Sequence, residues 1–291
     1  MSNPTAAMLV IGDEILSGRT RDGNTHYLAG QLTEAGIDLV EGRTVSDDRD
    51  AIIAAVKALS AAYDYVFTSG GIGPTHDDIT ADCIAAAFDN HIDVRNDARA
   101  LLQAHYDRSG QELNKARLRM ARIPDDATLI DNPVSTAPGF KLGNVHVMAG
   151  VPSVFQAMVA SVIPTLTGGA PLLSRSLRVV RGEGDIAGPL GAFAERYANL
   201  SVGSYPFQKD GVYGSNLVIR GSNAAELDSL LWPNLRIFLH EPTQRPNPLR
   251  GHRRDVARSL ATCRRTLGDP RRWKRRQPRQ RGNCAGGCDS G

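Results

Sequence analysis

A glycine-rich loop and two adjacent aspartates share one short segment of the chain, TSGGIGPTHDDIT at residues 68–80. Glycines let the backbone turn tightly and present N–H groups, and a following helix adds unpaired N–H groups and the positive end of its dipole. Both features attract phosphate, whereas the carboxylates repel it. The two are compatible when a cation lies between them, and oxygen ligands favour a hard divalent ion. The segment therefore predicts a phosphate site that shares a metal with the aspartates.

Each of the first three predicted strands is followed by a pair of acids, Asp13-Glu14, Asp47-Asp48 and Asp77-Asp78. Because ligands of a parallel sheet bind outside the carboxyl ends of its strands, we expect all three pairs at one rim. Helix capping is the alternative for single members, above all for Asp48 and to a lesser degree for Asp78. Capping uses one acid per helix, however, and leaves the doublets unexplained.

Apolar runs alternate with amphipathic segments over the first 90 residues, which predicts strands at 7–11, 37–45 and 65–68 and helices at 24–36, 47–62 and 80–88. Asn24 is the expected N-cap of the first helix. Strands separated by helices of this length indicate parallel pairing. We therefore predict a three-layer, doubly wound α/β core with a mostly parallel sheet.

The segment 97–122 is expected to be helical, with its buried side chains at Leu101, Leu102, Leu113 and Leu118. Residues 139–150 predict a hairpin around Gly143-Asn144, and 151–166 predict another helix. From about residue 175 a smaller α/β module begins, with strands at 176–180 and 216–220. We expect a main domain over 5–170 and a small α/β subdomain over 175–230.

The remaining segment, 231–291, is rich in Arg, Pro and Gly and is expected to be disordered. From Arg236 onward it carries 15 Lys and Arg against 4 Asp and Glu, whereas residues 1–235 carry 19 against 27. A basic tail can bind nucleic acid. The single Lys among its basic residues favours instead a segment translated out of frame, so a nucleic-acid partner is not expected.

Composition is that of an ordinary globular protein, with 41% hydrophobic and 22% charged residues. No apolar run approaches the ~20 residues of a membrane span, and the N-terminus lacks the features of a secretory signal, so we expect a cytoplasmic protein without a membrane partner. Motifs of serine hydrolases, P-loop kinases and zinc proteases do not occur. His76 is interpreted as a solvated loop residue and Cys83 as a small buried hydrophobe.

Six separated segments resemble, in order, the molybdopterin-binding (MoaB/Mog-like) superfamily, specifically the N-terminal domain of competence/damage-inducible protein A (CinA-like). They are IGDEILSG, DGNTHYLA, TVSDD, GGIGPTHDDIT, NPVSTAPGF and MAGVPS. The segments RGEGDIAGPL and VGSYPF resemble the family's small C-terminal subdomain, so the similarity covers roughly residues 5–228. Ala149 stands where many members carry proline, and Val154 where the long CinA proteins usually have Glu.

The resemblance implies a domain that binds a pterin or adenine nucleotide at the loop rim. Relatives include molybdopterin adenylyltransferases and divalent-metal-dependent pyrophosphatases that split ADP-ribose and similar dinucleotides. Asp78 and Thr80 match the family's D-x-T positions, Asp47 its acid after the second strand, and Gly150 and Pro152 its later loop. Deamidation of nicotinamide mononucleotide, which belongs to the amidase domain of the long proteins, is not expected.

We accordingly predict a hydrolase of a nucleotide diphosphate linkage that uses Mg²⁺, Mn²⁺ or Co²⁺. Asp47 and Asp78 are the expected catalytic residues, and Asp77 joins them as a metal ligand. The expected phosphate- and nucleotide-binding residues are Gly12, Asn24, Gly70, Gly71, Gly73, Pro74, Thr75, Thr80, Gly150 and Pro152. The alternatives are a molybdopterin adenylyltransferase or molybdopterin-binding protein of molybdenum cofactor metabolism, and a non-catalytic nucleotide- or pterin-binding module. The expected partner is a small molecule, and the expected assembly a homo-oligomer.

Overall fold

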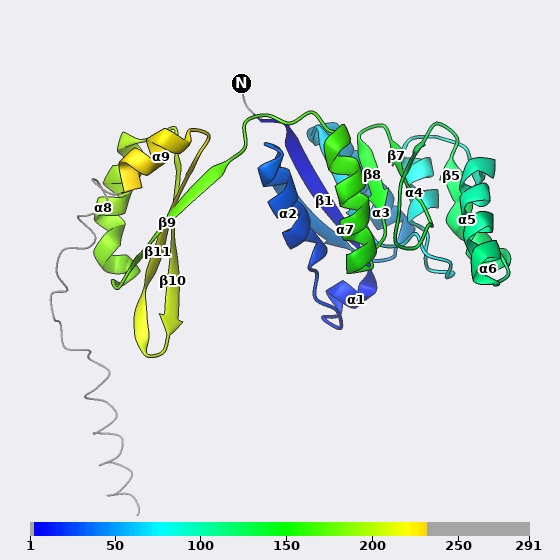
Figure 1. Ribbon diagram of the computed structural model, residues 1–291, viewed down its shortest axis with the longest axis horizontal. Helices are drawn as coiled ribbons and strands as arrows, with labels where there is room; N and C mark the ends of the chain where they lie inside the picture. The colour runs from blue at the N-terminus through cyan, green and yellow to red at the C-terminus, as the bar shows by residue number, and fades with distance from the viewer. Residues whose placement is uncertain (1–2, 232–291) are drawn as a thin grey trace, which may run out of the picture. The chain divides into compact units, whose positions relative to one another are not determined.

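A six-stranded mixed sheet forms the centre of the main unit in the computed structural model, which describes residues 3–231 (Figure 1). The strand order is β2-β1-β3-β8-β7-β6. The bounds are β1 (Thr5–Ile11), β2 (Asp38–Val45), β3 (Tyr65–Ser69), β6 (Thr128–Ile130), β7 (Gly139–Leu142) and β8 (Val145–Met148). β2, β1, β3 and β8 are parallel, and β7 and β6 add an antiparallel edge. The predicted α/β fold and the hairpin are confirmed, and the predicted tail lies outside the described residues.

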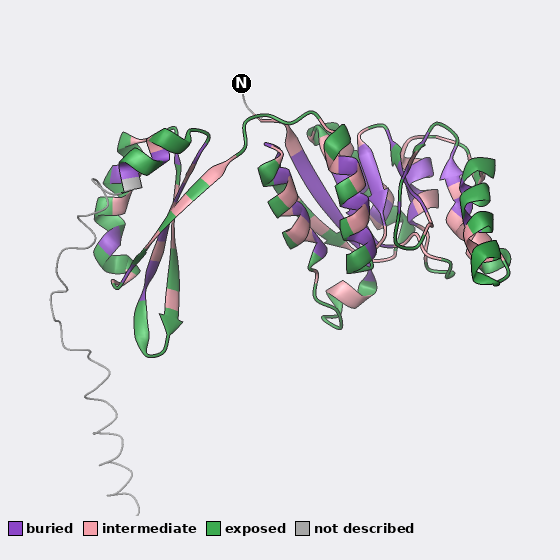
Figure 2. Cartoon of the chain, in the orientation of Figure 1, coloured by how far each residue is buried: buried purple, intermediate pink, exposed green. Residues whose placement is uncertain are grey.

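Helices cover both faces of this sheet, which gives the predicted three layers. They are α1 (Asp13–Leu16), α2 (Asn24–Glu34), α3 (Arg49–Ala62), α4 (Thr80–Ala87), α7 (Pro152–Val162) and the short helix η2 (Ile163–Thr165). One apolar cluster joins α3 and α4 to the sheet, and a second joins α2 and α7 to its other face. Figure 2 shows the central strands buried between helices whose outer faces are exposed. None of the helices within residues 3–231 is long and apolar enough to cross a bilayer.

The segment predicted as one helix over 97–122 is divided in the structure, and this prediction is wrong in part. It forms α5 (Asn96–Ser109), α6 (Lys115–Leu118), a short helix η1 (Arg119–Ala121) and a strand β5 (Arg122–Pro124). Gly110 ends α5 in the left-handed conformation at φ 66°, which a glycine adopts without strain. Leu102 is buried as expected, but Leu101 is 44% exposed because it points away from the core.

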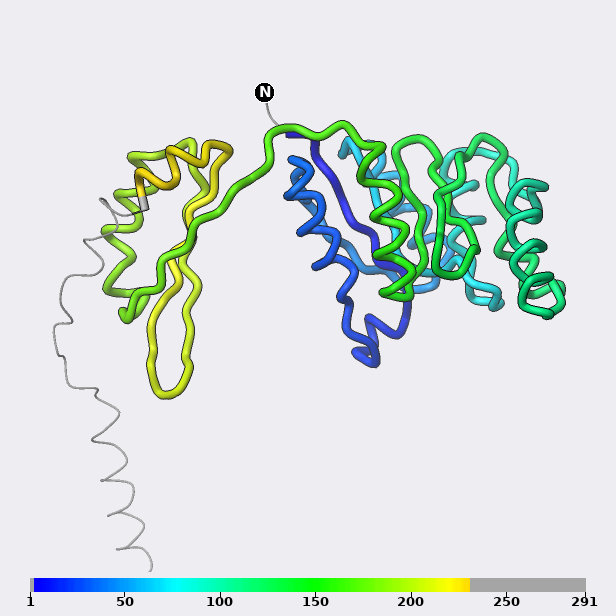
Figure 3. The backbone as a smooth tube through the Cα atoms, viewed as in Figure 1, coloured from blue at the N-terminus to red at the C-terminus, as the bar shows by residue number. Residues whose placement is uncertain are grey.

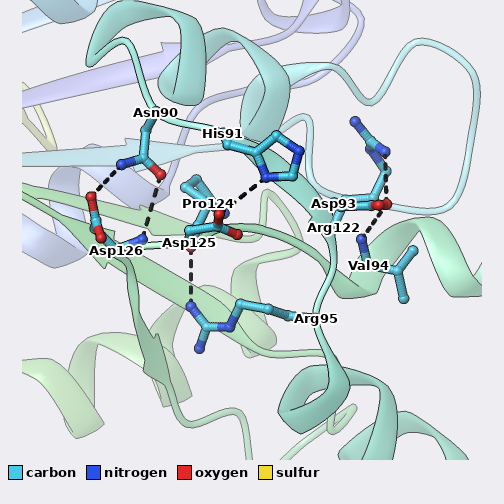
Figure 4. A network of polar contacts seen from close by, with 9 residues as sticks. All are labelled: Asn90, His91, Asp93, Val94, Arg95, Arg122, Pro124, Asp125 and Asp126. Carbon is cyan, nitrogen blue, oxygen red and sulfur yellow. Dashed lines mark hydrogen bonds and ion pairs between the residues drawn. The ribbon is translucent and has the colours of Figure 1, made fainter.

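β5 pairs antiparallel with β4 (Ile92–Val94) in a two-stranded ribbon beside the main sheet. Figure 4 shows the polar contacts that hold this ribbon and the turns that follow it. The side chain of Asn90 donates to Asp126, and Arg95 donates to the carbonyl oxygen of Pro124 at 3.1 Å. These strands have three residues each and are too short for the alternation in sequence that predicts a strand.

Residues 173–231 form a smaller α/β unit with its own apolar cluster. Its elements are β9 (Leu173–Val179), α8 (Glu183–Arg196), β10 (Ser201–Lys209), β11 (Val212–Gly221) and α9 (Ala224–Leu231). The antiparallel sheet has the order β10-β11-β9. The strands predicted at 176–180 and 216–220 fall largely within β9 and within β11. β10 was missed because it is an edge strand with none of its side chains fully buried.

Candidate functional site

A cleft of about 580 Å³ opens at the carboxyl ends of β1, β3 and β8. In the backbone trace of Figure 3, the segment that contains α1 projects from the end of β1 at this rim. The volume lies in the range of small-molecule and cofactor sites. The structure brings together at this cleft most of the predicted site residues, namely Gly12, Asp47, Gly70, Gly71, Gly73, Asp77, Asp78, Gly150 and Pro152.

In the glycine loop between β3 and α4, the backbone passes close to other groups at two glycines, where a larger side chain would not fit. Gly70 has φ 110°, and a Cβ there would lie 2.2 Å from the carbonyl oxygen of Ile11. Gly71 has φ 69°, and its Cβ would lie 2.1 Å from Oγ1 of Thr80. The buried hydroxyl of Thr80 donates to the carbonyl oxygen of Gly70 at 3.0 Å. Thr80 thus holds the loop from inside the protein and does not line the cleft.

The second half of the loop is organised around Asp78. Oδ2 of Asp78 accepts the backbone N–H of Thr75 at 2.8 Å and its hydroxyl at 2.5 Å. Pro74 and Thr75 are exposed and do not line the cleft, so their predicted contact with phosphate is untested. Asp77 precedes Asp78 in the chain. Hydrogen bonding by the Thr75 side chain is the main cause that lowers the pKa of Asp77, and a backbone hydrogen bond lowers it further.

Asp47 is an acid of the cleft whose pKa is raised. Its Oδ2 accepts the backbone N–H of Asp13 at 3.0 Å, which ties the end of β2 to the start of α1. Partial burial raises the pKa of Asp47, and the nearby charges of Asp13, Glu14 and Asp77 raise it further. Ionised Asp47 therefore lies among other negative groups. Its neighbour Asp48 accepts the N–H of Ala51 at 2.9 Å and caps α3, as the capping alternative predicted.

Among residues 3–231, no group of three or more His, Cys, Asp or Glu side chains is arranged to hold a metal ion. The predicted trio Asp47, Asp77 and Asp78 therefore lines one cleft without forming a complete metal site. Their oxygens nevertheless suit a hard divalent ion in kind. Mg²⁺ in particular is commonly held by one or two carboxylates together with phosphate oxygens of the ligand. A metal at this cleft remains a prediction.

Asn24 was predicted as an N-cap, and the structure corrects this. Gly23 is the N-cap residue, while Asp22 accepts the N–H of Asn24 at 2.9 Å. The buried side chain of Asn24 instead donates from Nδ2 to Oγ of Ser69 and to the carbonyl oxygen of Gly150, both at 2.8 Å. Asn24 therefore joins the end of β3 to the loop that follows β8.

Two interpretations of single residues are confirmed. The side chain of His76 is 99% exposed, as expected for a solvated loop histidine. Cys83 is buried, and burial raises the pKa of its thiol to about 11, so it behaves as a small apolar group.

Some residues of the cleft were assigned no binding role from the sequence. Glu14, Asn132 and Ser135 also line it. Glu14 belongs to the first acid doublet, and the two others lie in the segment NPVSTAPGF, which carried no assigned role. Asn132 is buried and shapes this loop by donating to Oγ of Ser135 at 2.6 Å and to the carbonyl oxygen of Ala137 at 2.8 Å.

Comparisons with known proteins show which families the two units resemble. Residues 7–168 match the family "Probable molybdopterin binding domain", and residues 171–231 match "FAD synthase, middle domain". A CinA-like protein from Citrifermentans bemidjiense is 39% identical over 56% of this chain and 40% of its own length. A probable FAD synthase from Caenorhabditis elegans is 31% identical over 78% of this chain and 48% of its own length. The chain thus spans less than half the length of either relative.

A solved structure also resembles the main unit. The crystal structure of the protein CinA with unknown function from Thermoplasma acidophilum matches 57% of this chain and 99% of its own. The two share 34% identity, with a TM-score of 0.52. The resemblance to CinA-like proteins is therefore confirmed. With its family match over more than half of its length, the chain belongs to the family of probable molybdopterin binding domains.

Proposed function

We propose that this chain is a divalent-metal-dependent hydrolase of a nucleotide diphosphate linkage. The observation that carries the proposal is the shared wall of the cleft, where the glycine loop and the carboxylates of Glu14, Asp47, Asp77 and Asp78 meet. Loop N–H groups attract phosphate, and carboxylates do not. A cleft that presents both suits a phosphate ligand that arrives with a cation.

The chain's own residues would share the work as follows. The loop at Gly71 and Gly73 would orient the diphosphate through backbone N–H groups. Asp47, Asp77 and Asp78 would hold the cation together with phosphate oxygens, and Asp78 has Oδ1 for this purpose because Thr75 occupies Oδ2. A bound divalent ion supplies polarisation of the phosphoryl oxygen and a lower pKa for water.

Asp47 is the proposed proton acceptor. Its carboxylate lines the cleft beside the glycine loop, and a positioned group that accepts a proton in the transition state contributes about 100-fold or more to a rate. In the proposed step, the oxygen of a water bonds to phosphorus while the bridging phosphorus–oxygen bond breaks. The proton of that water passes to Asp47, and the leaving phosphate takes the bridging oxygen.

The class of substrate is argued from size and from relatives. A cleft of about 580 Å³ admits a nucleotide with its diphosphate. Two relatives are named probable FAD synthases, and FAD itself contains a diphosphate linkage. FAD, ADP-ribose and coenzyme A are therefore the substrates to test.

Molybdopterin binding, with or without adenylyl transfer, is the second candidate. The observation that favours it is the family match over residues 7–168, whose description names molybdopterin. This activity would use the same rim but requires ATP and a pterin. A module that binds either ligand without turnover is the third candidate.

A panel of ligands and metals tests the three candidates on the full chain. FAD, ADP-ribose, coenzyme A, and ATP with molybdopterin are each incubated with Mg²⁺, Mn²⁺ or Co²⁺, and the products are separated by chromatography. The proposal expects mononucleotide products from at least one diphosphate substrate, and none after chelation. Adenylylated molybdopterin as the sole product would replace the proposal by the second candidate, and binding without any product would favour the third.

A further inference from the structure

A small chamber of about 20 Å³ lies against the glycine loop. It shares Gly71, Gly73 and Asp78 with the main cleft, so the two adjoin the same stretch of backbone. A space of this size holds about one water molecule. A single non-bridging oxygen of a phosphate is of comparable size. The chamber therefore suits one phosphate oxygen better than a whole ligand.

The side chain of Arg119 forms another wall of this chamber. Nη2 of Arg119 donates to the backbone carbonyl oxygen of Asp78 at 3.2 Å, which brings the guanidinium to the end of the loop. Nε of Arg119 is buried and has no hydrogen-bond partner in the protein. A buried donor without a partner is uncommon, and it indicates a group that a water or a ligand satisfies.

Arg122 and Asp82, which also line the chamber, are already paired with each other. Arg122 donates to Asp82 at 2.5 Å and lies 3.8 Å from Asp93. Asp78, whose carboxylate also faces this region, accepts two hydrogen bonds from Thr75. Arg119, by contrast, makes no ion pair with any carboxylate that the structure describes. Its positive charge is thus left for a group from outside the protein.

We infer that Arg119 and the glycine loop form an anion subsite that binds one phosphate oxygen of the ligand. The guanidinium supplies charge-assisted hydrogen bonds from one side, and the backbone N–H groups supply neutral ones from the other. The inference rests on the proposed function for its ligand, a diphosphate. It adds a cation that belongs to the protein to the divalent ion proposed for the acidic side of the cleft.

Binding of inorganic pyrophosphate tests the subsite without any need for turnover. Titration calorimetry on the full chain, with and without Mg²⁺, compares the wild type with Arg119→Met and Arg119→Lys. We expect Arg119→Met to bind pyrophosphate about 10-fold to 100-fold more weakly, since hydrogen bonds to charged groups are the strong ones. Arg119→Lys should recover part of the loss because it keeps the charge without the planar fork.

Arg117→Met is the matched control. The guanidinium of Arg117 stacks on Tyr106 at 4.5 Å and bonds to Gln111, so it has partners of its own. This variant removes the same charge from the same segment and should leave pyrophosphate affinity unchanged. Thermal unfolding of each variant checks that it is folded.

Three outcomes would overturn the inference: no pyrophosphate binding by the wild type, an affinity of Arg119→Met within twofold of the wild type, or an equal loss in Arg117→Met. A purely structural role at the carbonyl of Asp78 would lower the melting temperature and leave affinity intact. The two proposals can fail separately. Pyrophosphate binding that depends on Arg119, in a protein that hydrolyses none of the panel, would retain the subsite and reject the hydrolase.

Discussion

The backbone N–H of Asp13 donates to the carboxylate of Asp47 at 3.0 Å, so a side chain from the segment after β2 holds the first residue of α1. This bond holds Asp47 beside the acids that raise its pKa. Its neighbour Asp48 turns away and caps α3. Two adjacent aspartates therefore have different tasks, and each can be changed without the other.

Replacement of Asp47 by Asn should reduce hydrolysis of the active diphosphate substrate by about 100-fold or more, because general base catalysis contributes about that much. The amide oxygen can still accept the N–H of Asp13, so the fold should persist. Asp48→Ala is the control: loss of a helix cap costs about 1 kcal/mol of stability, and turnover should be retained. Rates of product formation and urea unfolding measure the two effects, and equal turnover in Asp47→Asn and wild type would reject the role of Asp47.

The raised pKa of Asp47 has a consequence for stability against pH. Asp47 binds its proton more tightly in the folded protein than in the unfolded chain, so it costs stability once the pH exceeds its ordinary value of 3.8, increasingly up to its raised pKa. The free energy of unfolding of Asp47→Asn, minus that of the wild type, should therefore be larger at pH 7 than at pH 3.5. Chemical unfolding at both pH values measures this difference, and a constant difference would contradict the raised pKa of Asp47.

A divalent ion should reduce the repulsion between the carboxylates of the cleft. Addition of Mg²⁺ with inorganic pyrophosphate should raise the melting temperature of the wild type, because a ligand that binds only the folded state stabilises it. The shift should be smaller in Asp77→Asn. Asp89→Asn, on the turn after α4, removes a carboxylate that does not line the cleft and serves as the control. An unchanged shift in Asp77→Asn would remove that residue from the metal set.

His146 predicts a loss of stability in acid. Burial lowers the pKa of His146 to about 4, with a smaller contribution from Lys141, whereas an unfolded histidine titrates near 6.5. The contribution of neutral His146 to the free energy of unfolding is fully present above pH 6.5. It is lost as the pH falls toward 4, by up to about 3 kcal/mol. His146→Leu should remove this dependence. His91→Leu, a control at an exposed ring beside Asp125, should leave it in place.

The glycine loop can be tested with two residues of similar backbone conformation. Gly71 and Gly18 have φ of 69° and 73°, but only Gly71 meets another group, Oγ1 of Thr80. Gly18→Ala should cost only the strain of a left-handed residue, about 1 kcal/mol. Gly71→Ala should cost more and should also weaken pyrophosphate binding. Similar effects of both substitutions in calorimetry and urea unfolding would mean that the close approach has no importance.

Much of the site could be predicted from sequence because its signals are local. The glycines at 70, 71 and 73 and the acid doublets lie directly after apolar strands, and parallel strands deliver such segments to one edge. Asp48 also followed a local rule, since its cap spans three residues. The α/β order of the main unit followed from the same periodicity.

The contacts that escaped prediction join residues far apart in the chain. Arg119 reaches the carbonyl of Asp78 across 41 residues, and no spacing in the sequence indicates this contact. The same holds for Asn24, whose type suggested a cap while its partners lie at 69 and 150. β10 lacked a pattern because an exposed edge strand needs no alternation of apolar and polar side chains.

The amide of Asn24 acts as a rivet between the end of β3 and the loop that follows β8, since one nitrogen donates to Ser69 and to Gly150 at the same distance. These two hydrogen bonds couple the movements of the two sides of the cleft. Any widening at the end of β8 must therefore pull on the end of β3, or else break the bond between Asn24 and Gly150.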